Sequence, residues 1–154
     1  MNPYQNLWGS PKIGNNCKIG AFVDIGKGVE IGDNCIIQAF VSIPPGWKIG
    51  NDVFIGPHAC FANDRVPGVK GDWKIQGGEV KDGAWIGMNA SIGAGLTIGE
   101  NAGVGMGSVV LKDIPDGEVW VGNPARRIKK KVKRQKIEGP FEKRPWEDHL
   151  SNSV

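Results

Sequence analysis

Residues that could move a proton or orient a nucleophile gather between His58 and Arg65. His58 can act as a general base because the ordinary pKa of an imidazole lies near neutral pH. Asn63 and Asp64 follow at the mouth of an irregular segment, where their oxygens could orient an attacking group or accept its proton. The sequence therefore predicts His58, Asn63 and Asp64 as catalytic residues.

Each of these residues also has a structural interpretation. A lone histidine at a corner could lie between copies of the chain, and an Asn-Asp pair could simply cap a turn. The irregular segment favours chemistry, because nothing in a regular stack requires an insertion. Two further residues are predicted to contact the substrate. Arg65 follows Asp64, and Gln38 stands eighteen residues before Gly56, where the pattern expects glycine.

The elements that position these residues follow a six-residue repeat. An aliphatic residue returns at every sixth position and is followed at most repeats by glycine, a period that neither a helix nor a simple strand has. A short strand and a corner every six residues make one side of a prism, and three sides close a coil of 18 residues. We therefore predict an all-β triangular solenoid of about five coils. The repeated residues are Ile13, Ile19, Ile25, Ile31, Ile37, Ile43, Ile49 and Ile55, then Ile86, Ile92, Ile98, Val104 and Val110.

Stacking at an interval of 18 residues makes specific predictions about neighbours. Cys17 and Cys35 should occupy the same inward position on adjacent coils, about 4.8 Å apart. Ile36, Phe54 and Trp85 should form an outward apolar column, which we interpret as the interface of a homotrimer rather than as scattered surface residues. The glycine after each isoleucine should supply either a positive φ or a backbone free of Cβ.

The rest of the chain divides into distinct segments. Residues 1–12 suggest a leading strand and cap, and residues 64–79 a loop ejected from one corner. Val119–Val121 should form a last strand, and Asn123-Pro124 resembles a helix start, with the helix running to about Lys136. We expect a β-helix domain over residues 1–122 and a C-terminal helix and tail over residues 123–154.

Composition restricts the setting and the class of site. Residues 1–125 carry nine Lys and Arg against twelve Asp and Glu, whereas residues 126–154 carry ten against four. Because the body is mildly acidic, we expect no nucleic-acid partner, and the lack of a long apolar run predicts no membrane segment. Three cysteines without a signal peptide indicate a cytoplasmic, reducing setting. The cysteines and histidines show no metal-ligand spacing.

Several segments resemble a known family. They are Ile55-Gly56-Pro57-His58, Phe61-Ala62-Asn63-Asp64-Arg65 with its loop, and Gly122-Asn123-Pro124-Ala125-Arg126. With the repeat, they resemble the hexapeptide-repeat acyltransferases and, more narrowly, the acetyl-CoA-dependent sugar-nucleotide N-acetyltransferases. The resemblance implies a left-handed parallel β-helix, a trimer, and acetylation of an amino sugar for bacterial surface polysaccharides. It also implies that Asn63 orients the amine.

Acetyl-CoA, the implied co-substrate, needs its own contacts. An N–H group near Gly93 or Gly95 could stabilise the oxyanion, and the pantetheine arm could run along Ala94, Met106 and Ser108. The cations of Lys112, Arg126 and Arg127 could hold the phosphates.

Other functions stay open at this point. O-acetylation of a hydroxyl would require His58 as base, and a scaffold whose basic tail binds nucleic acid would need no acetyl-CoA. A γ-type carbonic anhydrase is excluded because that site needs three histidine ligands and the chain has two.

Overall fold

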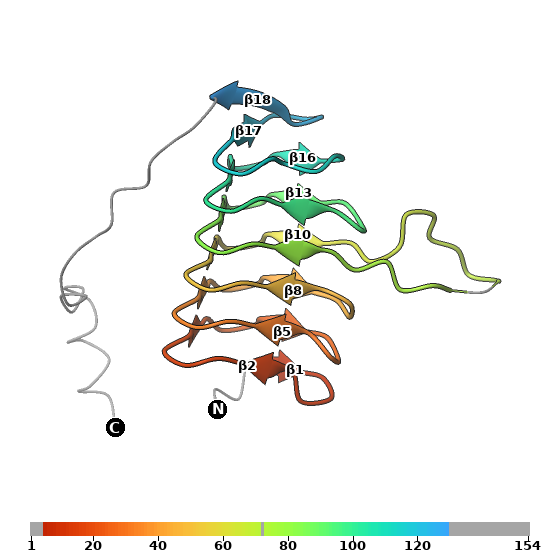
Figure 1. Ribbon diagram of the computed structural model, residues 1–154. Helices are drawn as coiled ribbons and strands as arrows, with labels where there is room; N and C mark the ends of the chain where they lie inside the picture. Colours follow the sequence, from red (N-terminus) through yellow and green to blue (C-terminus); the bar gives the residue numbers. More distant parts are fainter. Residues whose placement is uncertain (1–4, 72, 130–154) are drawn as a thin grey trace.

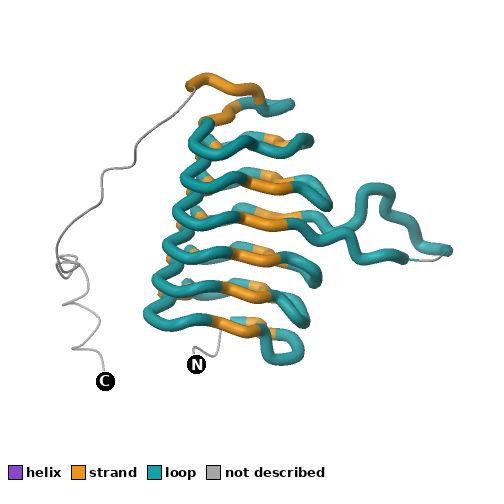
Figure 2. The backbone as a smooth tube through the Cα atoms, viewed as in Figure 1, coloured by secondary structure: helices purple, strands orange, loops and turns teal. Residues whose placement is uncertain are grey.

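The chain forms a three-sided parallel β-helix, described over residues 5–71 and 73–129 of a computed structural model. Coils of two-residue strands rise from the N-terminal end to the C-terminal end, and one loop projects sideways (Figures 1 and 2). No helix occurs within the described ranges. The all-β solenoid prediction is confirmed.

Three sheets form the sides of the prism, and successive coils add parallel strands to them, with the antiparallel β18 as the exception at the C-terminal end. Sheet A contains β1 (Asn6–Leu7), β4 (Asp24–Ile25), β7 (Ser42–Ile43), β10 (Cys60–Phe61), β13 (Ser91–Ile92) and β16 (Val109–Val110). Sheet B contains β2 (Lys12–Ile13), β5 (Glu30–Ile31), β8 (Lys48–Ile49), β11 (Glu79–Val80) and β14 (Thr97–Ile98). Sheet C contains β3 (Lys18–Ile19), β6 (Ile36–Ile37), β9 (Phe54–Ile55), β12 (Trp85–Ile86), β15 (Gly103–Val104), β17 (Val119–Val121) and β18 (Arg126–Lys129).

The sheets meet at three corners, which we name after the sheets they join. The AB corner includes residues 26–29, 44–47 and 93–96. The BC corner includes residues 14–17, 32–35 and 50–53, and the CA corner includes residues 20–23, 38–41 and 56–59. Each corner therefore collects residues that lie 18 positions apart, or 31 positions apart across the loop.

The repeated aliphatic residues fill the inside of the prism. From the second coil upward they are nearly all buried, including Ile25, Ile43, Ile55 and Ile86, whose exposure is zero. Burying such a side chain contributes about 1.5–3 kcal/mol. The residues that recur at every sixth position therefore form the core, as predicted.

The predicted outward column is confirmed on sheet C. Ile36 pairs with Phe54, and Phe54 pairs with Trp85 one coil above. All three side chains are half-buried in the single chain. Cys17 and Cys35 also lie on adjacent coils, and both thiols are free.

Most glycines that follow the repeated isoleucine serve close packing between coils rather than a positive φ. An ideal Cβ on Gly20 would lie 2.6 Å from the backbone nitrogen of Ala39, and one on Gly56 would lie 2.7 Å from that of Met88. Neither glycine has a positive φ. These glycines are therefore needed because they lack a Cβ, and not because they adopt a positive φ.

Positive φ values occur two residues after this glycine in each turn, and the corners fill that position differently. The BC corner uses asparagine, aspartate or glycine there, for example Asn34 at φ 58° and Asp52 at φ 56°. The CA corner instead places Phe22, Phe40 and His58 in the left-handed region, at φ 57°, 63° and 60°. Left-handed backbone costs a non-glycine residue about 1–2 kcal/mol, so these three residues are unusual.

The C-terminal helix predicted from Asn123 is wrong over residues 123–129. β18 instead runs antiparallel to β17. The physical reason is backbone hydrogen bonding. Val109 N–H donates to the Gly122 carbonyl at 2.9 Å, and Ala125 N–H donates to the Val109 carbonyl at 2.8 Å, so the segment closes the last edge of sheet A. Positions 130–136 of the predicted helix lie outside the described residues.

The stack is also longer than expected, at about six coils instead of about five. β1 adds a strand below the first full coil, and β17 and β18 add two above the last repeat. These strands lack the complete six-residue motif, which is why the repeat alone underestimates the length.

Candidate functional site

The predicted site residues lie in three places in the single chain. His58, Gln38 and Met106 lie at the CA corner. The AB corner holds a second group, whose members are Asn63, Asp64, Arg65, Gly93, Ala94 and Lys112. Arg126 and Arg127 lie in β18 at the end of the stack. Because His58 and Asn63 are separated by β10, they do not form a single cluster within one chain.

At the CA corner, His58 ends a stack of aromatic rings. The His58 imidazole lies 4.7 Å from the Phe40 ring centroid at an interplanar angle of 7°, and Phe40 lies 5.0 Å from Phe22 at 11°. Phe22 and Phe40 are 53% and 50% exposed. A stacked pair contributes about 0.5–1.5 kcal/mol, so the two stacks offset part of the left-handed backbone cost.

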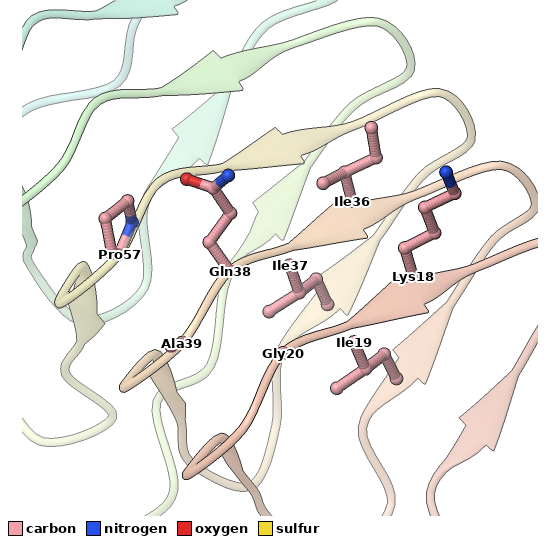
Figure 3. A pocket seen from close by; sticks show the side chains of 8 residues that line it. All are labelled: Lys18, Ile19, Gly20, Ile36, Ile37, Gln38, Ala39 and Pro57. Carbon is pink, nitrogen blue, oxygen red and sulfur yellow. The ribbon is translucent and has the colours of Figure 1, made fainter. Parts of the chain in front are cut away.

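A groove of about 520 Å³ lies on sheet C beside this stack (Figure 3). Ile36 and Pro57 form apolar walls, Lys18 lies at one end, and the Gln38 side chain extends along the corner. Gln38 stands where Gly20 and Gly56 stand in the coils on either side. Its amide makes no hydrogen bond within residues 5–71 and 73–129, so it can serve a ligand in this groove.

At the AB corner, a buried tryptophan supports the base of the loop. Trp47 has zero exposure, packs edge-on against Phe61 at 4.8 Å, and donates its indole N–H to the Ala62 carbonyl at 2.9 Å. Next to it, Asn63 Nδ2 donates to the Pro45 carbonyl of the coil below at 3.1 Å. This bond fixes the Asn63 amide and leaves Oδ1 as an acceptor, since no described residue donates to it.

The two residues after Asn63 tie the loop to its own base and to the coil above. Asp64 Oδ1 accepts the Val66 N–H at 2.9 Å, which makes Asp64 a turn cap. Arg65 Nε donates to the Ala94 carbonyl at 3.2 Å, and the Arg65 N–H donates to Gln76 Oε1 at 3.1 Å. The guanidinium therefore lies over the AB corner of the next coil, with its terminal nitrogens near Gly95.

The residues predicted to hold coenzyme A differ in accessibility. Lys112 and Arg126 are exposed, and Met106 is 75% exposed at the CA corner. Arg127 forms an ion pair with Glu118 at 3.2 Å. Ser108 is fully buried, and its Oγ accepts the Gly122 N–H at 3.1 Å. Ser108 therefore supports the final turn and offers no surface in the single chain.

This architecture is similar to that of known proteins. Residues 10–45 and 77–112 match the model of the bacterial transferase hexapeptide family (six repeats). These two segments make up 72 of the 154 residues, and over them the chain is similar to this family. A comparison with curated protein sequences gave no significant match.

Several solved structures share the fold. PerB from Caulobacter crescentus, solved with CoA and GDP-perosamine, is 27% identical, with a TM-score of 0.70 over 84% of this chain. The chain spans only about half of PerB, 56% of its length. The hexapeptide-repeat acetyltransferase VCA0836 from Vibrio cholerae is 27% identical, with a TM-score of 0.70 over 79% of this chain and 74% of its own. The N-acyltransferase AntD from Bacillus cereus, solved with dTDP and coenzyme A, has a TM-score of 0.77 at 23% identity over 86% of this chain and 81% of its own, and supports the fold alone.

Sequence reasoning missed two features of this hexapeptide-repeat protein. The aromatic stack was readable, because Phe22, Phe40 and His58 recur at the 18-residue interval of one coil. The sequence also contained a signal for the support beneath the loop. Trp47 takes an inward corner position that Val29 holds one coil below.

The described residues show neither a metal centre nor a membrane-spanning helix. In the described ranges, no group of three or more His, Cys, Asp and Glu side chains is placed to hold a metal ion. The same ranges contain no helix with the length and apolar character needed to cross a bilayer.

Proposed function

We propose that this hexapeptide-repeat protein transfers an acetyl group from acetyl-CoA to the amino group of a nucleotide-linked sugar. The observation that carries the proposal is the likeness to PerB, a structure solved with CoA and a nucleotide sugar, over 84% of this chain. The loop at the AB corner and the fixed amide of Asn63 support it. The sugar product would be used for surface polysaccharide synthesis.

Asn63 is suited to orient the amine. Its Nδ2 is held by the Pro45 carbonyl, so its Oδ1 can accept a hydrogen bond from an amino N–H and direct the nitrogen lone pair at the thioester carbon. The new C–N bond forms as the C–S bond breaks, and coenzyme A leaves as a thiolate. Because a thiolate is a good leaving group, no covalent intermediate with the protein is needed.

His58 is suited to take the proton that the amine loses. No described residue hydrogen-bonds to its ring nitrogens, and its side chain is exposed at the CA corner. General base catalysis contributes about 10²–10⁴-fold. We therefore expect His58→Ala to lower kcat, with complete loss pointing to a hydroxyl acceptor and partial loss to an amine.

His58 and Asn63 lie at different corners, so we propose that two copies of the chain complete the site in a homotrimer. The half-buried column Ile36, Phe54 and Trp85 supports contact between copies. Mixing His58→Ala chains with Asn63→Ala chains tests this arrangement. Exchange of subunits should restore part of the activity if the two residues act across a seam, and none if each chain acts alone.

Acetyl-CoA would lie along the upper coils. Lys112 and Arg126 are exposed cations suited to its phosphates, and Met106 offers apolar surface to the pantetheine arm. At the AB corner Ala94 is buried and its carbonyl is bonded to Arg65, so an extended chain there would pass beside the half-buried Gly93. Arg65, anchored through Nε on the Ala94 carbonyl, keeps terminal N–H groups for the diphosphate of the sugar nucleotide. Free thiols at Cys17, Cys35 and Cys60 support a reducing, cytoplasmic setting.

A thiol-release assay tests the proposal directly. Acetyl-CoA is incubated with the chain and a panel of UDP-, dTDP- and GDP-linked amino sugars, each matched with the same sugar carrying a hydroxyl in place of the amine. Thiol release with the amino sugar alone, with mass spectrometry showing the acetyl group on nitrogen, supports N-acetylation. Release with the hydroxyl sugar would indicate O-acetylation. Failure to bind acetyl-CoA at millimolar concentration would indicate a scaffold.

A further inference from the structure

The aromatic stack beneath His58 lies outside the core. Phe22 and Phe40 occupy a positive-φ turn position that at the BC and AB corners holds asparagine, aspartate, glycine or, in the first coil, Ser10. Their rings are about half exposed, so the core gains little from them. Backbone hydrogen bonds align the position from coil to coil, because Phe40 N–H donates to the Ala21 carbonyl and His58 N–H to the Ala39 carbonyl, both at 3.1 Å.

We propose that Phe40 is a positioning residue that fixes the plane of the His58 imidazole for proton transfer, an inference that rests on the function proposed above. The rings are nearly parallel, at 7° and 4.7 Å. Contact with Phe40 uses one face of the imidazole, and Asn89 lies above it in the same turn position of the next coil. Hydrogen bonds of an imidazole lie in its plane, so the ring nitrogens can be reached only from the side of the prism.

This geometry makes His58 selective for a group that approaches sideways. A substrate held in the groove beside Gln38 and Pro57, or presented by a neighbouring copy, approaches in that direction. Without the Phe40 ring, the imidazole could rotate about its side-chain bonds, and a smaller fraction of molecules would present a nitrogen to the substrate. We therefore expect loss of the ring to lower kcat about tenfold and to leave KM within twofold.

Phe40→Leu removes the ring and keeps an apolar side chain, and Phe40→Tyr keeps the ring as a rescue variant. Phe22→Leu is the matched control, because it removes a ring one coil further from His58 and should leave kcat within twofold. Because Phe40 is half exposed, its replacement should preserve the fold, which circular dichroism checks. Kinetics are measured with the best acceptor from the thiol-release panel.

Proton NMR of the histidine ring provides a readout that does not depend on activity. Stacking on Phe40 should shift the His58 ring protons upfield, and His58→Ala assigns these signals, since His149 is the other histidine. The shift should disappear in Phe40→Leu and persist in Phe40→Tyr and Phe22→Leu. An unchanged shift in Phe40→Leu would overturn the inference whatever the activity.

The kinetic outcomes separate this inference from the proposed function. Normal kcat in Phe40→Leu, or in His58→Ala, would overturn the positioning role while acyl transfer stands. If the unmodified chain transfers no acetyl group to any acceptor, the proposed function fails. The NMR shifts then still decide whether Phe40 orients His58.

Discussion

Replacing Gly87 with alanine tests the conclusion that these glycines allow close approach between coils. An ideal Cβ at this position would lie 2.5 Å from the Met106 nitrogen and 2.8 Å from the Gly105 carbonyl carbon. Both are backbone atoms that cannot rotate away, so the coils must separate locally. Overpacking of this kind costs about 1–3 kcal/mol, and we expect a value near 3 kcal/mol.

Gly107 supplies a matched control at the same corner, one coil above. Its φ is +66°, and an added Cβ would meet nothing within 4 Å. Gly107→Ala should therefore cost only the left-handed backbone, about 1–2 kcal/mol, reduced by the smaller entropy of the unfolded alanine chain. Gly107→Asn should cost less, because Asn89 already holds this turn position at φ 56°.

Thermal unfolding followed by circular dichroism measures the difference. At about 2–4 °C per kcal/mol for a chain of this size, Gly87→Ala should lower the midpoint by about 6–12 °C and Gly107→Ala by about 2–4 °C. Equal shifts in the two variants would refute the reasoning, because the crowded Cβ at position 87 would then cost no more than the unhindered Cβ at position 107.

Three further predictions concern groups placed by the fold. Trp47→Phe removes the hydrogen bond to the Ala62 carbonyl, so stability should fall by about 1 kcal/mol and limited proteolysis should cut the loop faster. Burial raises the pKa of the Cys35 thiol to about 12, so iodoacetamide at pH 8 should label exposed Cys60 first, as peptide mapping would show. Because the unfolded thiol ionises near its ordinary pKa of 9, the unfolded chain binds fewer protons between pH 9 and 12, and stability should fall as pH rises through this window. In urea titrations Cys35→Val should flatten this decline, and a slope that stays the same would contradict the assignment to Cys35.

The fold was predictable because each repeat by itself determines one short strand and one corner. One isoleucine such as Ile55 points inward, and one interval of 18 residues places Ile36 beside Phe54. The C-terminal segment was not predictable in this way. Asn123-Pro124 begins helices and also forms turns, and the deciding hydrogen bonds join Ala125 to Val109, which no local signal specifies.

The sequence singles out candidate site residues but does not specify how they are arranged in space. The irregular segment singled out Asn63, and the interruption of the glycine pattern singled out Gln38. Their partners depend on three-dimensional contacts, such as the bond from Asn63 to the Pro45 carbonyl and that from Arg65 to the Ala94 carbonyl. The burial of Ser108 by the final turn likewise follows from packing that the motif does not record.

In a triangular coil, separation along the sequence does not indicate which residues are in contact. His58 and Asn63 are five residues apart and lie at different corners, whereas Arg65 and Ala94 are 29 residues apart and make contact. A solenoid therefore builds a site by stacking residues at one corner, or by bringing two corners together from separate copies. The roles that we propose, proton acceptance by His58 and amine orientation by Asn63, would require the second solution. The ring stack under His58 is the kind of support that such a shared site needs, since no residue in the described part of the chain hydrogen-bonds to the imidazole from the side.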